Sequence, residues 1–117
     1  MWTIWKWDID GLGTEKLVEN CGIMSDVDLT GQHILSEIPF GAKMGVYEVS
    51  ISERKCVQLL PGIVTNNAVF APDGKSFLYA VASRAGEVTI YRQLWKDGKL
   101  VGTPVVALKV PFAFSLF

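Results

Sequence analysis

The sequence predicts an all-β fold, an incomplete propeller of about two and a half antiparallel, four-stranded β-propeller blades. Residues Asp28–Glu37 are echoed by Ala71–Ala80 at an offset of 43, and Ile4–Asp10 is echoed by Val46–Ser52 at an offset of 42. A repeat of about 40 to 45 residues that holds four short strands is typical of a propeller blade. No stretch carries apolar residues at helical spacing between helix caps, so no helix is expected.

The chain is predicted to open partway through a blade. Residues 1–20 form a half blade in this prediction, with strands over 2–7 and 15–19. Residues 21–62 form a full blade, because short apolar runs alternate there with polar turns. Its four strands are predicted at 24–28, 33–38, 45–51 and 56–60.

A second full blade is predicted over residues 63–110, and residues 111–117 are expected to begin a further blade. Its first turn is specific in chemistry: Pro72 pre-sets the backbone angle φ, Asp73 accepts main-chain hydrogen bonds, and Gly74 accommodates positive φ. The apolar run that follows favours a strand buried on both faces. The four strands are predicted at 68–71, 76–82, 87–93 and 103–110.

Composition and charge exclude several classes of protein. Half of the 117 residues are hydrophobic and a fifth are charged, which excludes a disordered chain, and the length suits a single domain. Together with the repeat, this predicts one partial propeller domain over residues 1–117. Eleven basic and twelve acidic side chains give a net charge of −1 without a basic stripe, so no nucleic-acid partner is expected. The apolar run 105–117 is too short and too interrupted for a membrane helix, and no signal peptide is visible, so no membrane partner is expected for this segment.

The two cysteines, Cys21 and Cys56, are expected to be free thiols, buried or half-buried. They occupy non-equivalent places in the repeat and lack the Cys-x-x-Cys spacing of a metal site. A single disulfide between them is the alternative.

No catalytic residue, metal site or cofactor is predicted. His33 is the only histidine; it opens a strand beside a turn, where a structural or surface role is expected, and no Gly-x-Ser-x-Gly motif accompanies it. The acidic residues Asp8, Asp10, Asp26 and Asp28 make two Asp-x-Asp pairs, but their spacing matches no EF-hand loop. Turn or surface roles are expected for them, with a weak calcium site as the alternative.

Four tryptophans offer the first candidate binding surface. Trp2, Trp5 and Trp7 cluster on one predicted strand, and Trp95 ends the matching strand two blades later. Packing between blades is expected to explain most of these rings, and an exposed recognition patch is the alternative.

Rim loops offer the second candidate surface, because propellers commonly bind partners there. The segments Phe40–Met44, Pro61–Asn67 and Ser83–Gly86 are expected to share one rim. The candidate rim-binding residues are Lys43, Asn66, Asn67 and Arg84.

The run Asn67–Ala80 resembles the Ser-Pro-Asp-Gly-Lys repeat of TolB-type propellers, which are relatives of the WD-repeat family. It departs from that repeat where Ala71 replaces the serine, and the preceding blade has Asp28-Leu-Thr-Gly31 in place of Pro-Asp-Gly. Neither blade has the Gly-His or Trp-Asp dipeptides of WD repeats, so that subfamily is disfavoured.

The segments Ile90–Pro104 and Pro111–Phe114 resemble the propeller that follows the catalytic domain in certain bacterial transmembrane Ser/Thr protein kinases. This resemblance implies an extracytoplasmic sensor or interaction region that binds a protein or a small ligand. It implies no kinase activity here, because the chain lacks the kinase motifs. The alternatives are a gating propeller of a prolyl-oligopeptidase-type hydrolase and a periplasmic TolB-like adaptor.

Two and a half blades do not close a ring, since a closed propeller has at least about four. Unpaired strand edges and the apolar run 112–117 therefore predict self-association, or packing against the remaining blades of a longer chain.

Overall fold

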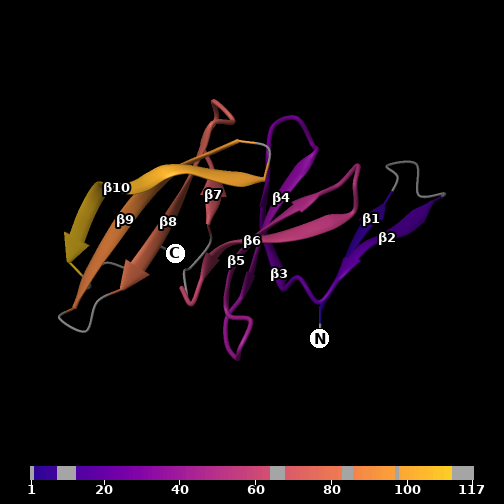
Figure 1. Cartoon of the computed structure of the whole chain (residues 1–117), viewed down its shortest axis with the longest axis horizontal. Helices are drawn as coiled ribbons and strands as arrows, with labels where there is room; N and C mark the ends of the chain where they lie inside the picture. Colours follow the sequence, from indigo (N-terminus) through magenta and orange to yellow (C-terminus); the bar gives the residue numbers. More distant parts are fainter. Residues whose placement is uncertain (1, 8–12, 64–67, 83–85, 97, 112–117) are drawn as a thin grey trace.

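The chain forms three antiparallel sheets that follow one another in chain order (Figure 1). The structure, a computed structural model, describes residues 2–7, 13–63, 68–82, 86–96 and 98–111, and within these ranges it contains strands and no helix. The sheets lie side by side along the longest axis of the molecule. The predicted all-β, incomplete propeller is confirmed; below, the two-stranded sheet is called the half blade and the four-stranded sheets the middle and last blades.

The first sheet has two strands and the other two have four each. The half blade pairs β1 (Thr3–Trp7) with β2 (Thr14–Glu19). The middle blade has the order β3 (Ile23–Val27), β4 (His33–Ile38), β5 (Gly45–Ser50) and β6 (Lys55–Pro61). The last blade has the order β7 (Val69–Phe70), β8 (Ser76–Ala82), β9 (Glu87–Lys96) and β10 (Lys99–Pro111).

The turn between β7 and β8 has the predicted chemistry. The N–H of Gly74 donates to the carbonyl of Ala71 at 3.0 Å, and the N–H of Lys75 donates to Asp73 Oδ1 at 2.9 Å. Gly74 has a φ of 71°, in the left-handed region that favours glycine. The turn between β3 and β4 instead uses the carboxylate of Asp28, which accepts hydrogen bonds from the main-chain N–H groups of Gln32 and His33.

A β-bulge recurs at the same step of the outer strand pair in all three sheets. The register passes from Ile4↔Val18 to Trp5↔Lys16 in the half blade, from Val46↔Leu60 to Tyr47↔Gln58 in the middle blade, and from Ile90↔Leu108 to Tyr91↔Val106 in the last blade. The residues left out of the pairing are Leu17, Leu59 and Ala107. This shared irregularity aligns the three sheets residue by residue.

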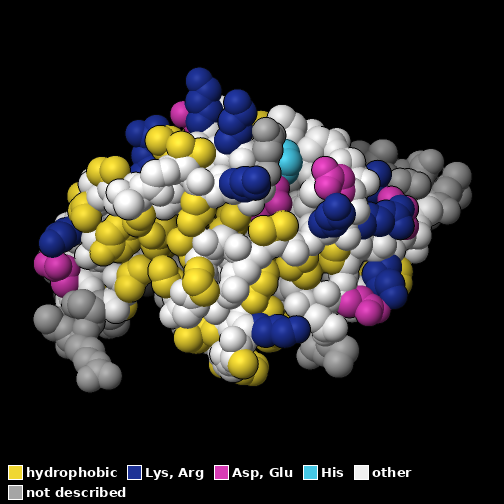
Figure 2. All heavy atoms as spheres, viewed as in Figure 1, with side chains coloured by type: hydrophobic (Ala, Val, Ile, Leu, Met, Phe, Trp, Pro, Cys, Tyr) yellow, Lys and Arg dark blue, Asp and Glu magenta, His cyan; other side chains and the backbone are white. Residues whose placement is uncertain are grey.

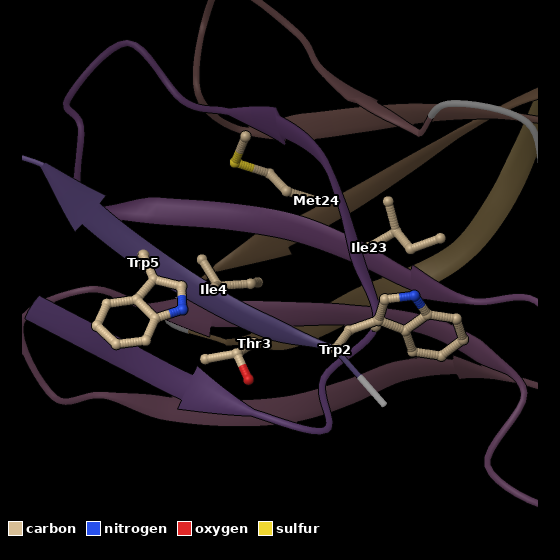
Figure 3. A pocket seen from close by; sticks show the side chains of 7 residues that line it. Trp2, Thr3, Ile4, Trp5, Ile23 and Met24 are labelled. Carbon is tan, nitrogen blue, oxygen red and sulfur yellow. The ribbon is translucent and has the colours of Figure 1, made fainter.

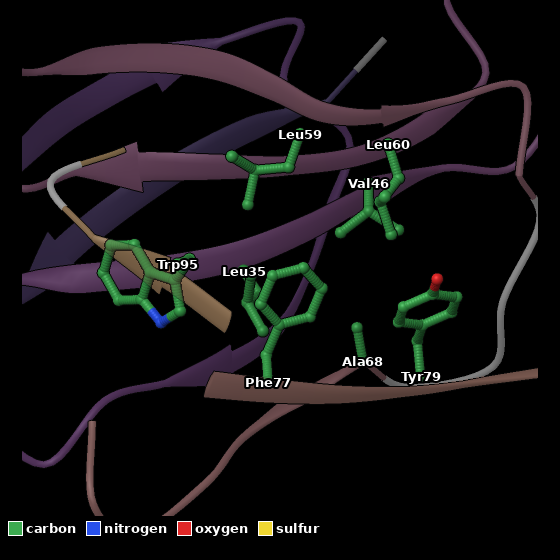
Figure 4. Close-up of a cluster of buried hydrophobic side chains, with 8 residues drawn as sticks. All are labelled: Leu35, Val46, Leu59, Leu60, Ala68, Phe77, Tyr79 and Trp95. Atoms are coloured by element: carbon green, nitrogen blue, oxygen red, sulfur yellow. The ribbon is translucent and has the colours of Figure 1, made fainter. Parts of the chain in front are cut away.

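Two seams of buried side chains hold neighbouring blades together. The seam between the half blade and the middle blade contains Ile4, Leu17, Val18, Cys21, Ile34 and Val49. The seam between the middle and last blades contains Leu35, Val46, Leu59, Leu60, Ala68, Phe77, Tyr79 and Trp95 (Figure 4). Each blade therefore covers the apolar face of its neighbour, as stacked propeller sheets must to bury their cores.

The last two strands are longer than predicted. The strand predicted at 87–93 continues to Lys96, and the one predicted at 103–110 already begins at Lys99 and includes Pro111. Trp95 explains the extension of β9, because its side chain is buried in the seam and holds this end of the strand against the middle blade. The hairpin is consequently tight, with Lys96 paired to Lys99.

Cys21 and Cys56 form a disulfide bond, with their Cα atoms 6.3 Å apart, so the expectation of free thiols is wrong. Cys21 lies just before β3 in the first seam, and Cys56 lies on β6, where it pairs with Val49 of β5. The bond joins residues 35 positions apart in sequence. It therefore fastens the outer strand of the middle blade to the segment that leaves the half blade.

Candidate binding groove

An apolar groove runs between β1 of the half blade and the start of β3 (Figure 3). It has a volume of about 360 Å³. The residues that line it are Trp2, Thr3, Ile4, Trp5, Gly22, Ile23 and Met24. None of these side chains is charged, so the groove offers aromatic and aliphatic surface.

The groove lies beside an unpaired strand edge. Among the described residues β1 pairs only with β2, whereas the other two sheets contain four strands. Trp5 is 54% exposed, and Ile23 and Met24 are about equally exposed. An open edge next to exposed apolar side chains is a site where an added strand gains main-chain hydrogen bonds and apolar burial together.

Two local features fix the shape of the groove. The N–H of Asn20 donates to the carbonyl of Trp2 at 2.8 Å, and the Trp2 ring packs edge-on against Phe40 at a centroid distance of 5.9 Å. Gly22 has a φ of 86°, and a Cβ atom there would lie 2.2 Å from the carbonyl oxygen of Glu37. Glycine is therefore required where the chain passes from the half blade to β3.

The tryptophans divide between the two roles considered for them. Trp95 is buried in the seam between the middle and last blades, where it packs edge-on against His33 and tilted against Phe70. Trp5 and Trp2 line the groove instead. The side chain of Trp7 lies outside the described residues.

Of the predicted rim-binding residues, the structure describes Lys43 alone; Asn66, Asn67 and Arg84 lie outside the described residues. Lys43 is exposed in the loop between β4 and β5, and its carbonyl accepts a hydrogen bond from the Tyr47 hydroxyl. The N–H of Gly62 donates to the carbonyl of Met44 at 2.8 Å, which brings this loop beside the segment that follows β6. The rim site of Lys43, Asn66, Asn67 and Arg84 stays a prediction.

A polar cluster inside the second seam explains the single histidine. His33 Nδ1 lies 2.6 Å from Glu48 Oε1, and the imidazole packs edge-on against Trp95 at a centroid distance of 4.9 Å. Glu48 is only 3% exposed. His33 therefore joins a buried carboxylate of its own blade to an aromatic ring of the next.

Carboxylates of the middle blade also hold the first strand of the last blade. Asp26 Oδ2 accepts a hydrogen bond from the N–H of Phe70 at 2.7 Å, and Glu37 Oε2 accepts one from the N–H of Ala68 at 3.4 Å. Asp28 serves the β3–β4 turn, where the Thr30 hydroxyl donates to it at 2.9 Å. Asp26 and Asp28 have structural partners, while Asp8 and Asp10 lie outside the described residues.

The same seam contains Tyr79, a tyrosine whose pKa is raised. Burial raises the pKa of Tyr79 above its ordinary value of 10.0, and the neighbouring Tyr91 raises it further. The two rings stack with centroids 5.3 Å apart. A neutral phenol in such a place stabilises packing and offers no general base at neutral pH.

The described residues contain no group of three or more His, Cys, Asp or Glu side chains able to hold a metal ion. Within the same ranges, no helix is long and apolar enough to cross a membrane.

Trp2 and Trp5 stand out in the sequence as part of an aromatic cluster, whereas Ile23 and Met24 do not. The available signal was the half blade itself, since a sheet of two strands leaves the adjacent face of the next blade partly uncovered. Identifying the uncovered residues required the register of β3 against β4, which shifts between Asp26 and Met24 and places Met24 opposite Ser36.

Neither a protein-family model nor a curated protein sequence matches the chain. Among solved structures it is similar to the crystal structure of TolB from Acinetobacter baumannii, with a TM-score of 0.61 and 23% sequence identity. The similarity covers 84% of this chain and 25% of the TolB chain, so the chain spans about a quarter of that protein's length. At this identity the similarity concerns the fold alone: the chain has the fold of part of a TolB-like β-propeller.

Proposed function

We propose that the chain is a non-catalytic binding segment of a β-propeller, and that the groove between β1 and β3 accepts apolar side chains of a protein or small ligand. The observation that carries this proposal is the coincidence of exposed Trp5, Ile23 and Met24 with the unpaired edge of β1. Aromatic and methionine side chains are enriched at sites of protein recognition.

An extended peptide fits the groove better than a globular surface does. The free edge of β1 offers main-chain donors and acceptors, and the groove beside it offers a place for alternate side chains of an added strand. The expected ligand is therefore an extended segment with an apolar residue at every second position.

We further propose that the segment belongs to the sensor or interaction region of a bacterial Ser/Thr protein kinase. The support is the resemblance of Ile90–Pro104, which forms most of the β9–β10 hairpin. An extracytoplasmic location agrees with the Cys21–Cys56 disulfide, because disulfides persist in oxidising compartments. A TolB-like periplasmic adaptor is the second candidate, favoured by the fold shared with TolB.

The complete reading frame separates these assignments. Kinase motifs followed by a membrane helix ahead of the segment would support the kinase sensor, and a secretory signal with propeller repeats alone would support the adaptor. A Gly-x-Ser-x-Gly motif after the segment would overturn both in favour of a gating propeller of a hydrolase.

Binding at the groove is tested with a defined probe, an N-acetylated and C-amidated octapeptide of alternating valine and threonine. We expect it to shift the indole N–H resonances of Trp2 and Trp5 in two-dimensional NMR spectra. Met24→Glu places a charge in the groove and should abolish the shifts. Leu29→Glu is the matched control, since Leu29 is 85% exposed and lies outside the groove. Equal loss in both variants, or no shift in the wild type, would refute binding at this site.

A further inference from the structure

The last blade has a large apolar face that nothing in the described structure covers. The register of β7 to β10 places on this face the side chains Val69, Leu78, Ile90, Leu94, Val101, Val105 and Leu108. Four of these side chains are more than 40% exposed: Leu94, Val101, Val105 and Leu108. Figure 2 shows hydrophobic side chains gathered over this end of the molecule. Monomeric proteins rarely expose a contiguous apolar face of this kind.

The recurring bulge identifies this face as a blade seam. In the half blade, Ile4 and Val18 flank the bulge and are buried under the middle blade. In the middle blade, the equivalent Val46 and Leu60 are buried under the last blade. In the last blade, no described sheet covers the equivalent Ile90 and Leu108, and Leu108 is 53% exposed.

A polar pair marks the same place on both faces. Leu35 pairs with Glu48 in the middle blade as Leu78 pairs with Arg92 in the last blade, so Arg92 stands at the position of Glu48. Arg92 Nε donates to Ser76 Oγ at 3.2 Å, and Ser76 opens β8 as His33 opens β4. The open face thus repeats the layout of a filled seam, with a cation where the filled seam has an acid.

The half blade carries the other side of such a seam. Trp5, Tyr47 and Tyr91 are equivalent residues that follow the bulge step in the three sheets. Tyr47 is buried and Tyr91 packs against the second seam, each on the face turned toward the preceding blade. Trp5 occupies the same position, no described sheet lies on its far side, and it is 54% exposed.

We propose that two copies of this chain associate head to tail. The face of the half blade that carries Trp5 packs on the face of the partner's last blade that carries the side chains of Ile90 and Leu108. Each of these faces is equivalent to one side of the seams inside the chain. Packing them together would therefore form a further seam of the same kind. The contact is heterologous, and two such contacts related by a two-fold axis close a ring. The ring contains six sheets, within the range of about four to eight blades found in propellers.

The test is the mass of the full chain in solution, measured by light scattering and sedimentation velocity over a concentration series. We expect twice the chain mass of 12.9 kDa. Leu108→Lys should give a monomer, because it places a charge in the proposed contact. Val106→Lys is the matched control: Val106 is 48% exposed on the opposite face of β10, and its equivalents are Gln58 and Lys16. It should leave the dimer intact.

A mixture of two monomeric variants tests the head-to-tail geometry. Trp5→Lys removes one side of the contact and Leu108→Lys removes the other, so a mixed pair keeps one intact contact. We expect native mass spectrometry to show the heterodimer in the mixture and no dimer of either variant alone. A symmetric contact between like faces would give no such rescue. A wild-type monomer, a dimer that survives Leu108→Lys, or a mixture without heterodimer would each overturn the proposal.

The proposed contact shares Trp5 with the groove, but its other side, on the last blade, does not. Leu108 lies in the last blade, so Leu108→Lys leaves the groove lining unchanged. Peptide-induced shifts that persist in that variant would separate a failed dimer from a failed binding site.

Discussion

His33 and Glu48 form the polar centre of the seam between the middle and last blades, with Nδ1 of one 2.6 Å from Oε1 of the other. They come from neighbouring strands, β4 and β5, and the edge of the imidazole rests against Trp95 of β9. An acidic side chain that is 3% exposed is tolerated in an apolar seam only when a partner satisfies it. The pair therefore couples the orientation of one blade to the next.

Glu48→Ala should lower the free energy of unfolding by about 1–3 kcal/mol, because it leaves His33 without its acceptor in the seam. Urea unfolding measures the change. Glu53→Ala is the control, since Glu53 lies in an exposed turn and its side chain is 65% exposed. Its effect should stay within about 0.5 kcal/mol. If both variants lose the same stability, the contact with His33 contributes nothing specific.

Gly22→Ala should be far more damaging than Gly41→Ala, although the two glycines have nearly the same φ, 86° and 91°. Both variants bear the cost of about 1–2 kcal/mol for a side chain in the left-handed region. At Gly22 the new Cβ also meets the Glu37 carbonyl oxygen at 2.2 Å, whereas at Gly41 it meets nothing within 4 Å. The clash should add about 1–3 kcal/mol. Thermal unfolding of the two variants checks the difference, and equal melting temperatures would contradict it.

Replacing both Cys21 and Cys56 by serine should lower the stability by about 4 kcal/mol. The bond closes a loop with a sequence separation of 35, and the estimate follows from the lost restriction of the unfolded chain. Unfolding of the wild type in reducing buffer should reproduce the effect, and the serine variant should not respond to reductant. A wild type whose unfolding is insensitive to reductant would contradict the prediction.

Alkaline pH should destabilise the second seam through Tyr79. Burial and Tyr91 raise the pKa of Tyr79 above 10.0, so the unfolded chain loses this proton at a lower pH than the folded chain does. Its contribution to stability is complete below about pH 10 and is lost as the pH rises through the folded-state pKa. Tyr79→Phe should show a shallower decline in unfolding free energy above pH 10. If the unfolding free energies of the wild type and of Tyr79→Phe fall equally steeply above pH 10, Tyr79 is not the group responsible.

The order of the strands was predictable because turn chemistry and apolar runs are local signals. Pro72, Asp73 and Gly74 mark a turn without any knowledge of its surroundings, and the 42–43-residue offset assigns the flanking strands. The full lengths of β9 and β10 were not predictable, because they depend on the burial of Trp95 against the middle blade. The repeat favoured free thiols over the disulfide for a related reason: Cys21 and Cys56 meet in a seam, and the repeat alone gives no register between neighbouring blades.

The groove was predictable in part. Trp2 and Trp5 were evident as an aromatic cluster, and the half blade predicted unpaired strand edges. Their neighbours Ile23 and Met24 come from another sheet, so only the placement of β3 beside β1 reveals them. The buried acid Glu48 gave no signal at all in sequence, because its partner His33 lies 15 residues away on the adjacent strand.

The extra residue in each outer strand pair constrains how such a chain can lengthen during evolution. Duplicating a whole unit reproduces the irregularity in phase and keeps Ile4, Val46 and Ile90 turned the same way. Losing one residue from β2, β6 or β10 would instead shift the rest of that strand by one position and turn its apolar side chains from the seam to solvent. We therefore expect this architecture to gain or lose whole blades more readily than single residues within these strands.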